Sequence, residues 1–134
     1  MSLAYNPYSQ YKKQAVTTAN PGKLLIMLFD GALKFSGRAR LAIEENDIEQ
    51  ANNYIKKCQD IIDELTSSLN MDYEISKQLY PLYEYINHQF LQANIHKDTR
   101  FLDEADKLLR DFRATWLEAS KIVKKSGGEL GEQS

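Results

Sequence analysis

Apolar and polar positions alternate along most of this chain with the period of an α-helix. In two stretches the apolar positions follow steps of three and four residues without interruption, which places them on one helix face because each residue turns the helix by about 100°. The pattern predicts four helices, over residues 21–45, 48–69, 73–96 and 99–125. The two unbroken rows consist of Ile48, Ala51, Ile55, Cys58, Ile62, Leu65 and Leu69, and of Leu102, Ala105, Leu109, Phe112, Trp116, Ala119 and Val123.

Residues that favour helix starts lie between these stretches. Asn20 is followed by Pro21, and proline is tolerated at the first helical position, so the first helix is expected to begin there. Asp47, with Gln50 three residues later, resembles a capping box for the second helix. Asp98 is the expected N-cap of the last helix. The connections are therefore short, and consecutive helices should be antiparallel.

The third helix carries a less regular row and an internal proline. Pro81 should remove one backbone hydrogen bond and either kink this helix or delay its beginning. The residues expected in its buried stripe are Ile75, Leu79, Leu82, Ile86, Phe90 and Ala93.

Four helices of about 30 Å, at roughly 1.5 Å per residue, use most of a 134-residue chain. The expected fold is all-α: an antiparallel four-helix bundle with an N-terminal arm or short extra helix. We expect an arm over residues 1–19, the bundle over 20–126 and a disordered, glycine-containing tail over 127–134.

Charge and hydropathy exclude several kinds of partner. The chain has 17 basic and 19 acidic residues, a formal charge of −2, and no basic stripe, so nucleic acid is not an expected partner. Its longest apolar run, residues 24–29, is far shorter than the roughly 18 residues that span a bilayer, so membrane insertion is not expected. No secretion signal is evident, and the expected location is the cytoplasm.

Candidate catalytic chemistry is sparse. The Glu-x-x-His spacing of di-iron bundles is absent, as are nucleophile motifs and glycine-rich phosphate loops. Glu84 and His88 lie four residues apart on one helix face, which favours a surface pair. We therefore expect no enzyme activity, no cofactor and no metal. One alternative is a metal-binding bundle enzyme that uses Glu84 and His88.

The first helix has more apolar perimeter than a bundle corner needs. On a helical wheel the apolar residues of its N-terminal half, among them Leu24, Leu25 and Phe29, surround almost the whole axis. A corner helix buries a stripe of about 100° or somewhat more. Either this helix is central or covered by the arm, or it offers a groove to another chain. A structural homodimer that uses this face is a further alternative.

The third helix gives a second indication of a binding surface. Tyr80 and Leu91 project to one side of its core stripe, beside Asn87 and Asn94. A tyrosine at the edge of a groove can bury its ring and keep its hydroxyl in water. Alternatively, these two side chains form the rim of an ordinary core.

Several segments resemble the FliS family of flagellar secretion chaperones. They are Tyr-Ser-Gln-Tyr at 8–11, Ala-Asn-Pro-Gly-Lys-Leu-Leu-Ile-Met-Leu-Phe-Asp-Gly-Ala at 19–32, Leu-Tyr-Glu-Tyr at 82–85 and Leu-Gln-Ala-Asn at 91–94. The Asp98 turn and Trp116 fit the same pattern, and the resemblance covers about residues 5 to 120. The sequence departs from it at His88 and Gln89, where relatives often have two arginines, so any contact made by those arginines is in doubt here.

The resemblance implies a cytoplasmic, non-enzymatic chaperone. Such a protein binds the disordered C-terminal segment of flagellin, prevents premature polymerisation and delivers flagellin to the flagellar type III export gate. Members of the family also form homodimers. Tyr8 and Tyr11 occupy the family's N-terminal motif, in an arm that can cover the binding groove when no client is bound. The residues predicted to line apolar grooves for the client are Leu25, Phe29, Leu33, Tyr80 and Leu91.

Overall fold

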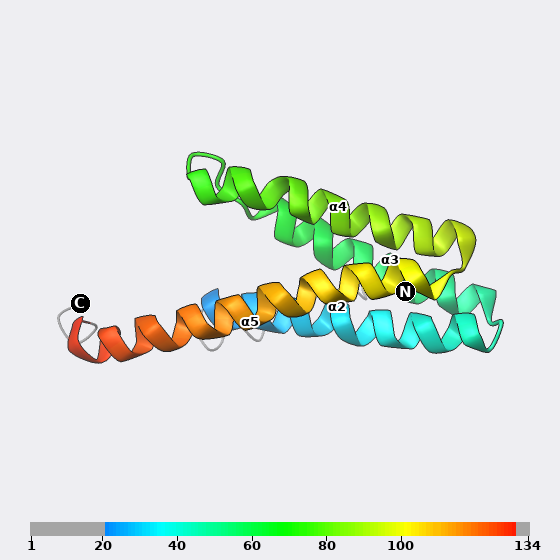
Figure 1. Cartoon of the computed structure of the whole chain (residues 1–134), viewed down its shortest axis with the longest axis horizontal. Coiled ribbons are helices and arrows are strands. Elements are labelled where there is room, and N and C mark those ends of the chain that lie inside the picture. Colours follow the sequence, from blue (N-terminus) through cyan, green and yellow to red (C-terminus); the bar gives the residue numbers. More distant parts are fainter. Residues whose placement is uncertain (1–20, 131–134) are drawn as a thin grey trace, which may run out of the picture.

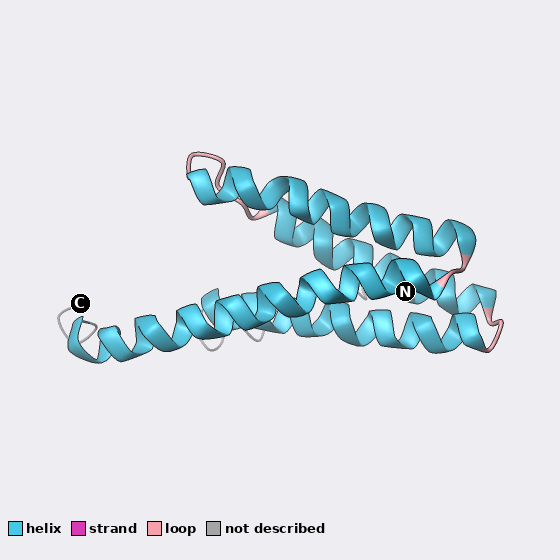
Figure 2. Ribbon diagram, viewed as in Figure 1, coloured by secondary structure: helices cyan, strands magenta, loops and turns pink. Residues whose placement is uncertain are grey.

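The computed structural model describes residues 21–130 of the chain, and within this range it consists of helices joined by short turns. Figure 2 shows no strand in the described part, which confirms the all-α prediction. The helices are α2 (Pro21–Glu44), α3 (Ile48–Ser67), α4 (Glu74–His96) and α5 (Thr99–Leu130) (Figure 1). Residues 1–20 and 131–134 lie outside the described range, so the predicted arm, Tyr8 and Tyr11 do too. The division into arm, bundle and tail stays a prediction.

The four helices form a closed ring in which each helix packs against two neighbours. Helix α2 packs against α3 and α5, and α4 packs against the same two helices. Within the described range the diagonal pairs, α2 with α4 and α3 with α5, do not pack directly. Figure 1 shows that the α2/α5 pair and the α3/α4 pair lie closest where α4 passes into α5, and that they separate towards the start of α4. The bundle is therefore tighter at one end than at the other.

Two of the three predicted caps, Asp47 and Asp98, begin their helices as expected, and the third, Asn20, lies outside the described residues. The Asp47 carboxylate accepts a hydrogen bond of 3.1 Å from the backbone N–H of Gln50 at the start of α3. At the start of α5, Asp98 accepts one of 2.9 Å from the N–H of Arg100. The Arg100 side chain also bonds Asp98 and, with that N–H, lowers the pKa of the carboxyl to about 2, so the cap stays charged.

The helix boundaries agree with the sequence prediction to within two residues, except at the end of α5. Helix α4 begins at Glu74 and continues through Pro81, so the proline does not delay its start. Pro81 is exposed, and a proline inside a helix leaves one carbonyl of the preceding turn without its usual donor. Helix α5 continues to Leu130 rather than ending near residue 125. In Figure 1 its last turns run past the other three helices.

The core follows the two regular apolar rows closely. On α3 the predicted residues Ala51, Ile55, Cys58, Ile62 and Leu65 are buried, and Leu69 is partly buried against them. On α5, Leu102, Ala105 and Leu109 are buried, while Phe112 and Trp116 are partly buried. Ile48 is exposed instead of buried, because it is the first residue of α3 and lies at the end of the bundle.

The predicted stripe of α4 is wrong in its first half. Ile75 and Leu82 are 58% and 39% exposed, whereas Ser76 and Tyr83 are buried. The packed row is Ser76, Leu79, Tyr83, Ile86, Phe90 and Ala93, which alternates steps of three and four residues without interruption. The sequence therefore contains the packed row, but a search for apolar residues does not select it, because two of its members are a serine and a tyrosine.

Three aromatic side chains connect α2, α5 and α4 inside the bundle. Phe29 of α2 stacks on Phe112 of α5, with ring centroids 6.2 Å apart. Phe112 in turn meets Tyr83 of α4 edge to face at 5.6 Å. Both contacts lie in the range favourable for aromatic pairs. Through Phe112 these rings connect α2 with α4, whose backbones do not approach each other closely.

Gly37 lies inside α2, at a position where a larger side chain would have room. A Cβ atom at this helical position would meet nothing within 4 Å. Gly37→Ala should raise the free energy of unfolding by about 0.5 to 1 kcal/mol, because alanine loses less backbone entropy in a helix. Thermal and urea unfolding would measure the gain. Gly37→Ser should gain less, and destabilisation by alanine would contradict the open environment.

The corrected stripe of α4 predicts opposite outcomes for two adjacent residues. Tyr83→Ala should lower the free energy of unfolding by about 3 to 5 kcal/mol, the range for losing a buried aromatic ring. Leu82→Ser should lower it by less than about 1 kcal/mol, because much of that side chain is already in water. Urea unfolding of both variants would check this. A larger loss of unfolding free energy in Leu82→Ser than in Tyr83→Ala would instead support the predicted stripe, in which Leu82 is buried.

Candidate functional site

The candidate site is a set of exposed apolar side chains on α4. Ten large hydrophobic side chains are exposed in the described part of the chain, and seven of them belong to α4 or to its N-cap. The seven are Tyr73, Ile75, Tyr80, Leu82, Tyr85, Leu91 and Ile95. Single exposed hydrophobic residues are normal, but their concentration on one helix is typical of an interaction surface.

Six of these side chains, all except Ile95, form two rows, one on each side of the buried stripe of α4. Tyr80 and Leu91 are eleven residues apart, close to three full turns, so they share a side. That side faces α3, because Leu91 lines a groove together with Gln59. We call Tyr73, Tyr80 and Leu91 the α3-side row.

The second row lies on the side of α4 that faces α5. Leu82 lies seven residues after Ile75 and three before Tyr85, so these residues share a side. The Tyr85 hydroxyl lies 3.5 Å from the Glu104 carboxylate of α5, which fixes the direction of this row. We call Ile75, Leu82 and Tyr85 the α5-side row. The sequence pattern does not indicate this row as a surface, because the predicted buried stripe of the third helix includes Ile75 and Leu82.

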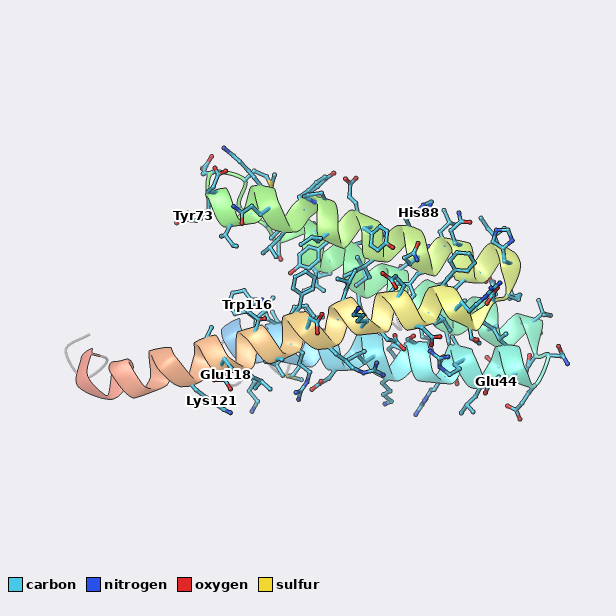
Figure 3. The ribbon with its side chains drawn as sticks, viewed as in Figure 1. Glu44, Tyr73, His88, Trp116, Glu118 and Lys121 are labelled. Atoms are coloured by element: carbon cyan, nitrogen blue, oxygen red, sulfur yellow. The ribbon has the colours of Figure 1, made fainter. Side chains whose placement is uncertain are left out.

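The α5-side row begins near the wide end of the bundle, since Ile75 lies in the first turn of α4. Figure 3 shows Trp116 projecting from α5 towards the side on which α4 begins, with Tyr73 at the start of α4. Trp116 is only partly buried, although it packs against the core. Because α4 and α5 separate towards this end (Figure 1), Ile75 lacks the cover that Ala93 has at the tight end.

The three predicted site residues on α2 are less accessible than those on α4. Leu25 and Leu33 are partly buried against the core, and Phe29 is fully buried under Phe112 and its neighbours. Within the described helix, the large apolar residues between 24 and 33 are at least half-buried. Among the described residues, the larger exposed apolar surface therefore lies on α4.

Tyr80 and Leu91 are exposed by 39% and 43%, as a partner surface requires. They lie on a different helix from Leu25, Phe29 and Leu33, and α2 and α4 do not pack directly. The structure therefore does not bring all the predicted residues into one groove. A partner role for each of them stays a prediction.

The described residues were compared with the requirements of a metal site and of a membrane-spanning helix. Between residues 21 and 130 no group of three or more His, Cys, Asp and Glu side chains is placed to hold a metal ion. Glu84 and His88 both line the α3/α4 groove, where they are exposed. No helix of the described range has the length and apolar character needed to cross a bilayer.

A buried polar cluster lies between α2 and α5, away from the α4 surface. Asp106 is 3% exposed and receives a 3.4 Å hydrogen bond from Arg40, which also pairs with Asp103. Ser36 lies beside the carboxyl and favours its charged form, but no hydrogen bond of normal geometry joins them. Burial outweighs these partners and raises the pKa of Asp106.

The same cluster affects Cys58, which is fully buried and donates to the carbonyl of Ala32. Burial, with a smaller contribution from the charge of Asp106, raises the pKa of the Cys58 thiol well above its usual value. A buried thiol of this kind is a poor nucleophile. Ser36, Asp106 and Cys58 are buried, whereas Arg40 reaches solvent and Asp103 is exposed, so the buried part of the cluster favours a structural role.

The Asp106 pKa predicts a pH-dependent difference in stability. Because its folded-state pKa is raised, the charged form destabilises the fold at neutral pH, and protonation removes this penalty as the pH falls through that pKa. Asp106→Asn cannot titrate. The stability of wild type relative to Asp106→Asn should therefore improve between pH 7 and pH 4. Urea unfolding across this range would measure it, and a constant difference would contradict the assignment.

Comparison with known proteins gives the family. The family model described as flagellar protein FliS matches residues 4–123. The flagellar secretion chaperone FliS of Bacillus subtilis is 41% identical over 127 residues, which cover 92% of this chain and 96% of that protein. FliS of Salmonella typhimurium is 35% identical over 81% of this chain and 82% of its own length. FliSB of Pseudomonas aeruginosa is 34% identical over 84% and 92%. This chain therefore belongs to the FliS family of flagellar secretion chaperones.

Proposed function

We propose that this protein is a cytoplasmic export chaperone for flagellin. It binds the disordered C-terminal segment of flagellin, prevents premature polymerisation and delivers the client to the gate of the flagellar type III export apparatus. The observation that carries the proposal is the concentration of exposed apolar side chains on α4, in a chain of the FliS family. Neither a cofactor nor a catalytic residue is needed for this function.

A disordered client requires an extended surface rather than one pocket. Each ordered residue of the client loses about 1 to 2 kcal/mol of backbone entropy, which apolar burial must offset. The α3-side and α5-side rows lie on both flanks of α4 and together extend along most of its length. Such a surface suits a segment that wraps around the helix, in contact with more than one face.

The predicted contact residues fall into three groups under this proposal. Tyr80 and Leu91 contact the client directly, since both are exposed. Leu25 and Leu33 contribute their remaining exposed surface, and Phe29 supports the site from within the core. Tyr8 and Tyr11 act as a displaceable cover in the N-terminal arm. The sequence similarity to FliS proteins, which includes both tyrosines, supports this last assignment.

Two other functions remain as alternatives with their own tests. A metal-binding enzyme that uses Glu84 and His88 would contain stoichiometric iron or zinc after purification, which metal analysis would detect. A structural homodimer would keep its mass when the client is added. Light scattering with and without client would show whether dimer formation and client binding compete.

Binding of a flagellin C-terminal peptide tests the function and the site together. Leu91→Asp and Tyr80→Asp should each weaken binding by about tenfold or more, because a charge replaces apolar contact area worth over 1.4 kcal/mol. Leu41→Asp is the matched control, since Leu41 is 58% exposed but lies on α2. Calorimetric titration would give the affinities, with circular dichroism to confirm helicity.

The outcomes distinguish an error in the identity of the client from an error in the position of its contact surface. If folded wild type does not bind the peptide, the client assignment is wrong. If wild type binds and the α4 variants bind equally well, the contact surface lies elsewhere. Phe29→Asp is unsuitable as a test, because an unpaired carboxylate at a fully buried position would unfold the bundle.

A further inference from the structure

Two aromatic rings and three basic side chains lie together between α2 and α3. Phe35 of α2 and Tyr54 of α3 stack with their ring centroids 6.2 Å apart. The Lys57 ammonium lies over both rings, 5.3 Å from the centroid of Phe35 and 5.4 Å from that of Tyr54. The Lys34 ammonium lies 6.0 Å from Phe35, and the guanidinium carbon of Arg38 lies 5.9 Å from Tyr54. We call these five residues the cationic patch.

The two exposed cations of the patch have no carboxylate as a partner. Between residues 21 and 130 neither Lys34 nor Arg38 forms an ion pair, whereas Arg40 and Arg113 each pair with an aspartate across the α2/α5 contact. Residues 31–43 of α2 contain three basic residues and no acidic one. Cation–π attraction to the two rings holds the patch together, but it leaves the positive charge of Lys34 and Arg38 directed at solvent.

An open groove adjoins the patch and leads to the turn between α2 and α3. Its volume is about 330 Å³, and its lining includes Arg38 and Tyr54 of the patch. Leu41, which is 58% exposed, lines it next along α2. Glu45 and Asp47 line it at the turn, two helical turns beyond Arg38. Along α2 the groove therefore changes from positive through apolar to negative.

This order of charges decides which class of anion the surface fits. A nucleic acid carries phosphate along its whole length, so a strand that follows the groove from the patch would meet the Glu45 and Asp47 carboxylates. A peptide can carry carboxylates at one end only and an apolar side chain next to them. Exposed Leu41 also favours a peptide, because an aliphatic side chain gains nothing from a phosphate.

We propose that the cationic patch binds an acidic segment of a partner protein other than the client. Its carboxylates lie over Lys34 and Arg38, and an apolar side chain beside them covers Leu41. This surface is separate from the exposed rows of α4, because it lies between α2 and α3, and α2 does not pack against α4. The partner and the client can therefore be bound at the same time. Since the contacts are charged and open to solvent, they act on the rate of association and weaken with salt.

The test uses the isotopically labelled full chain and two synthetic peptides. One is Glu-Asp-Glu-Leu-Leu-Ser-Gln-Ser, and the other has Gln and Asn in place of its acidic residues. NMR titration with the acidic peptide should shift the amide signals around Lys34, Arg38 and Leu41. Lys34→Glu and Arg38→Glu should each weaken its binding by about fivefold or more, because repulsion replaces attraction. Lys107→Glu is the matched control, since Lys107 is exposed on α5 and its reversal changes the net charge equally.

Binding that is lost in the patch variants and kept in Lys107→Glu supports the proposal. Equal binding of the neutral peptide, or tighter binding of a single-stranded oligonucleotide than of the acidic peptide, overturns it. Absence of binding also overturns it, because the cations then serve only to cover the two rings. Circular dichroism and urea unfolding of Lys34→Glu would confirm that the variant is folded.

The same variants separate this inference from the chaperone function. A flagellin C-terminal peptide should bind Lys34→Glu and wild type equally well. Weaker binding of the flagellin peptide to Lys34→Glu would make the patch part of the client surface, so the second partner would be wrong and the chaperone function would stand. Wild type that binds the acidic peptide but no flagellin peptide would remove the chaperone function and leave this inference in place.

Discussion

In a closed ring of four helices, each helix can bury only the stripe that faces its two neighbours. The described part of this chain obeys that limit, since neither diagonal pair of helices packs directly. Phe112 of α5 links three of the four helices, because its side chain contacts Phe29 of α2 and Tyr83 of α4. Once Tyr83 points inwards, the rotation of α4 is fixed. Leu82 and Tyr85 are then left outside the core.

The exposed surface of α4 is thus a consequence of how the core is packed. A helix with one apolar stripe would have left only polar residues at those positions. Here the apolar residues of α4 exceed what α3 and α5 can cover, and the remainder divides into two rows with different neighbours. One row lies beside the polar α3/α4 groove, and the other begins near the wide end of the bundle, towards which Trp116 projects. The two flanks of α4 therefore differ in chemistry.

Much of the fold could be predicted because local signals agreed with the global arrangement. The rows on α3 and α5 are regular, and Asp47 and Asp98 mark helix starts by hydrogen bonds that involve neighbouring residues only. The rotation of α4 was harder to predict. Ile75 and Leu82 are more apolar than Ser76 and Tyr83, yet the latter pair is buried, since Tyr83 meets Phe112 across the bundle.

The candidate site was predictable only in part for the same reason. Tyr80 and Leu91 were identified because they lie off the apolar stripe under either assignment. A helical wheel shows only the residues of one helix, so it cannot show that Phe29 is covered by another helix. Phe112, which stacks on Phe29, lies in a distant part of the sequence.

The proline in α4 has a consequence for the energetics of the first turns of this helix. Between Glu74 and Leu82 only Ser76 is fully buried, and Pro81 removes one of the backbone hydrogen bonds that hold those turns. Few buried contacts and a missing bond are features of segments that open locally at low free energy while the rest of a domain stays folded. We therefore expect the start of α4 to open more readily than the rest of the bundle, without global unfolding.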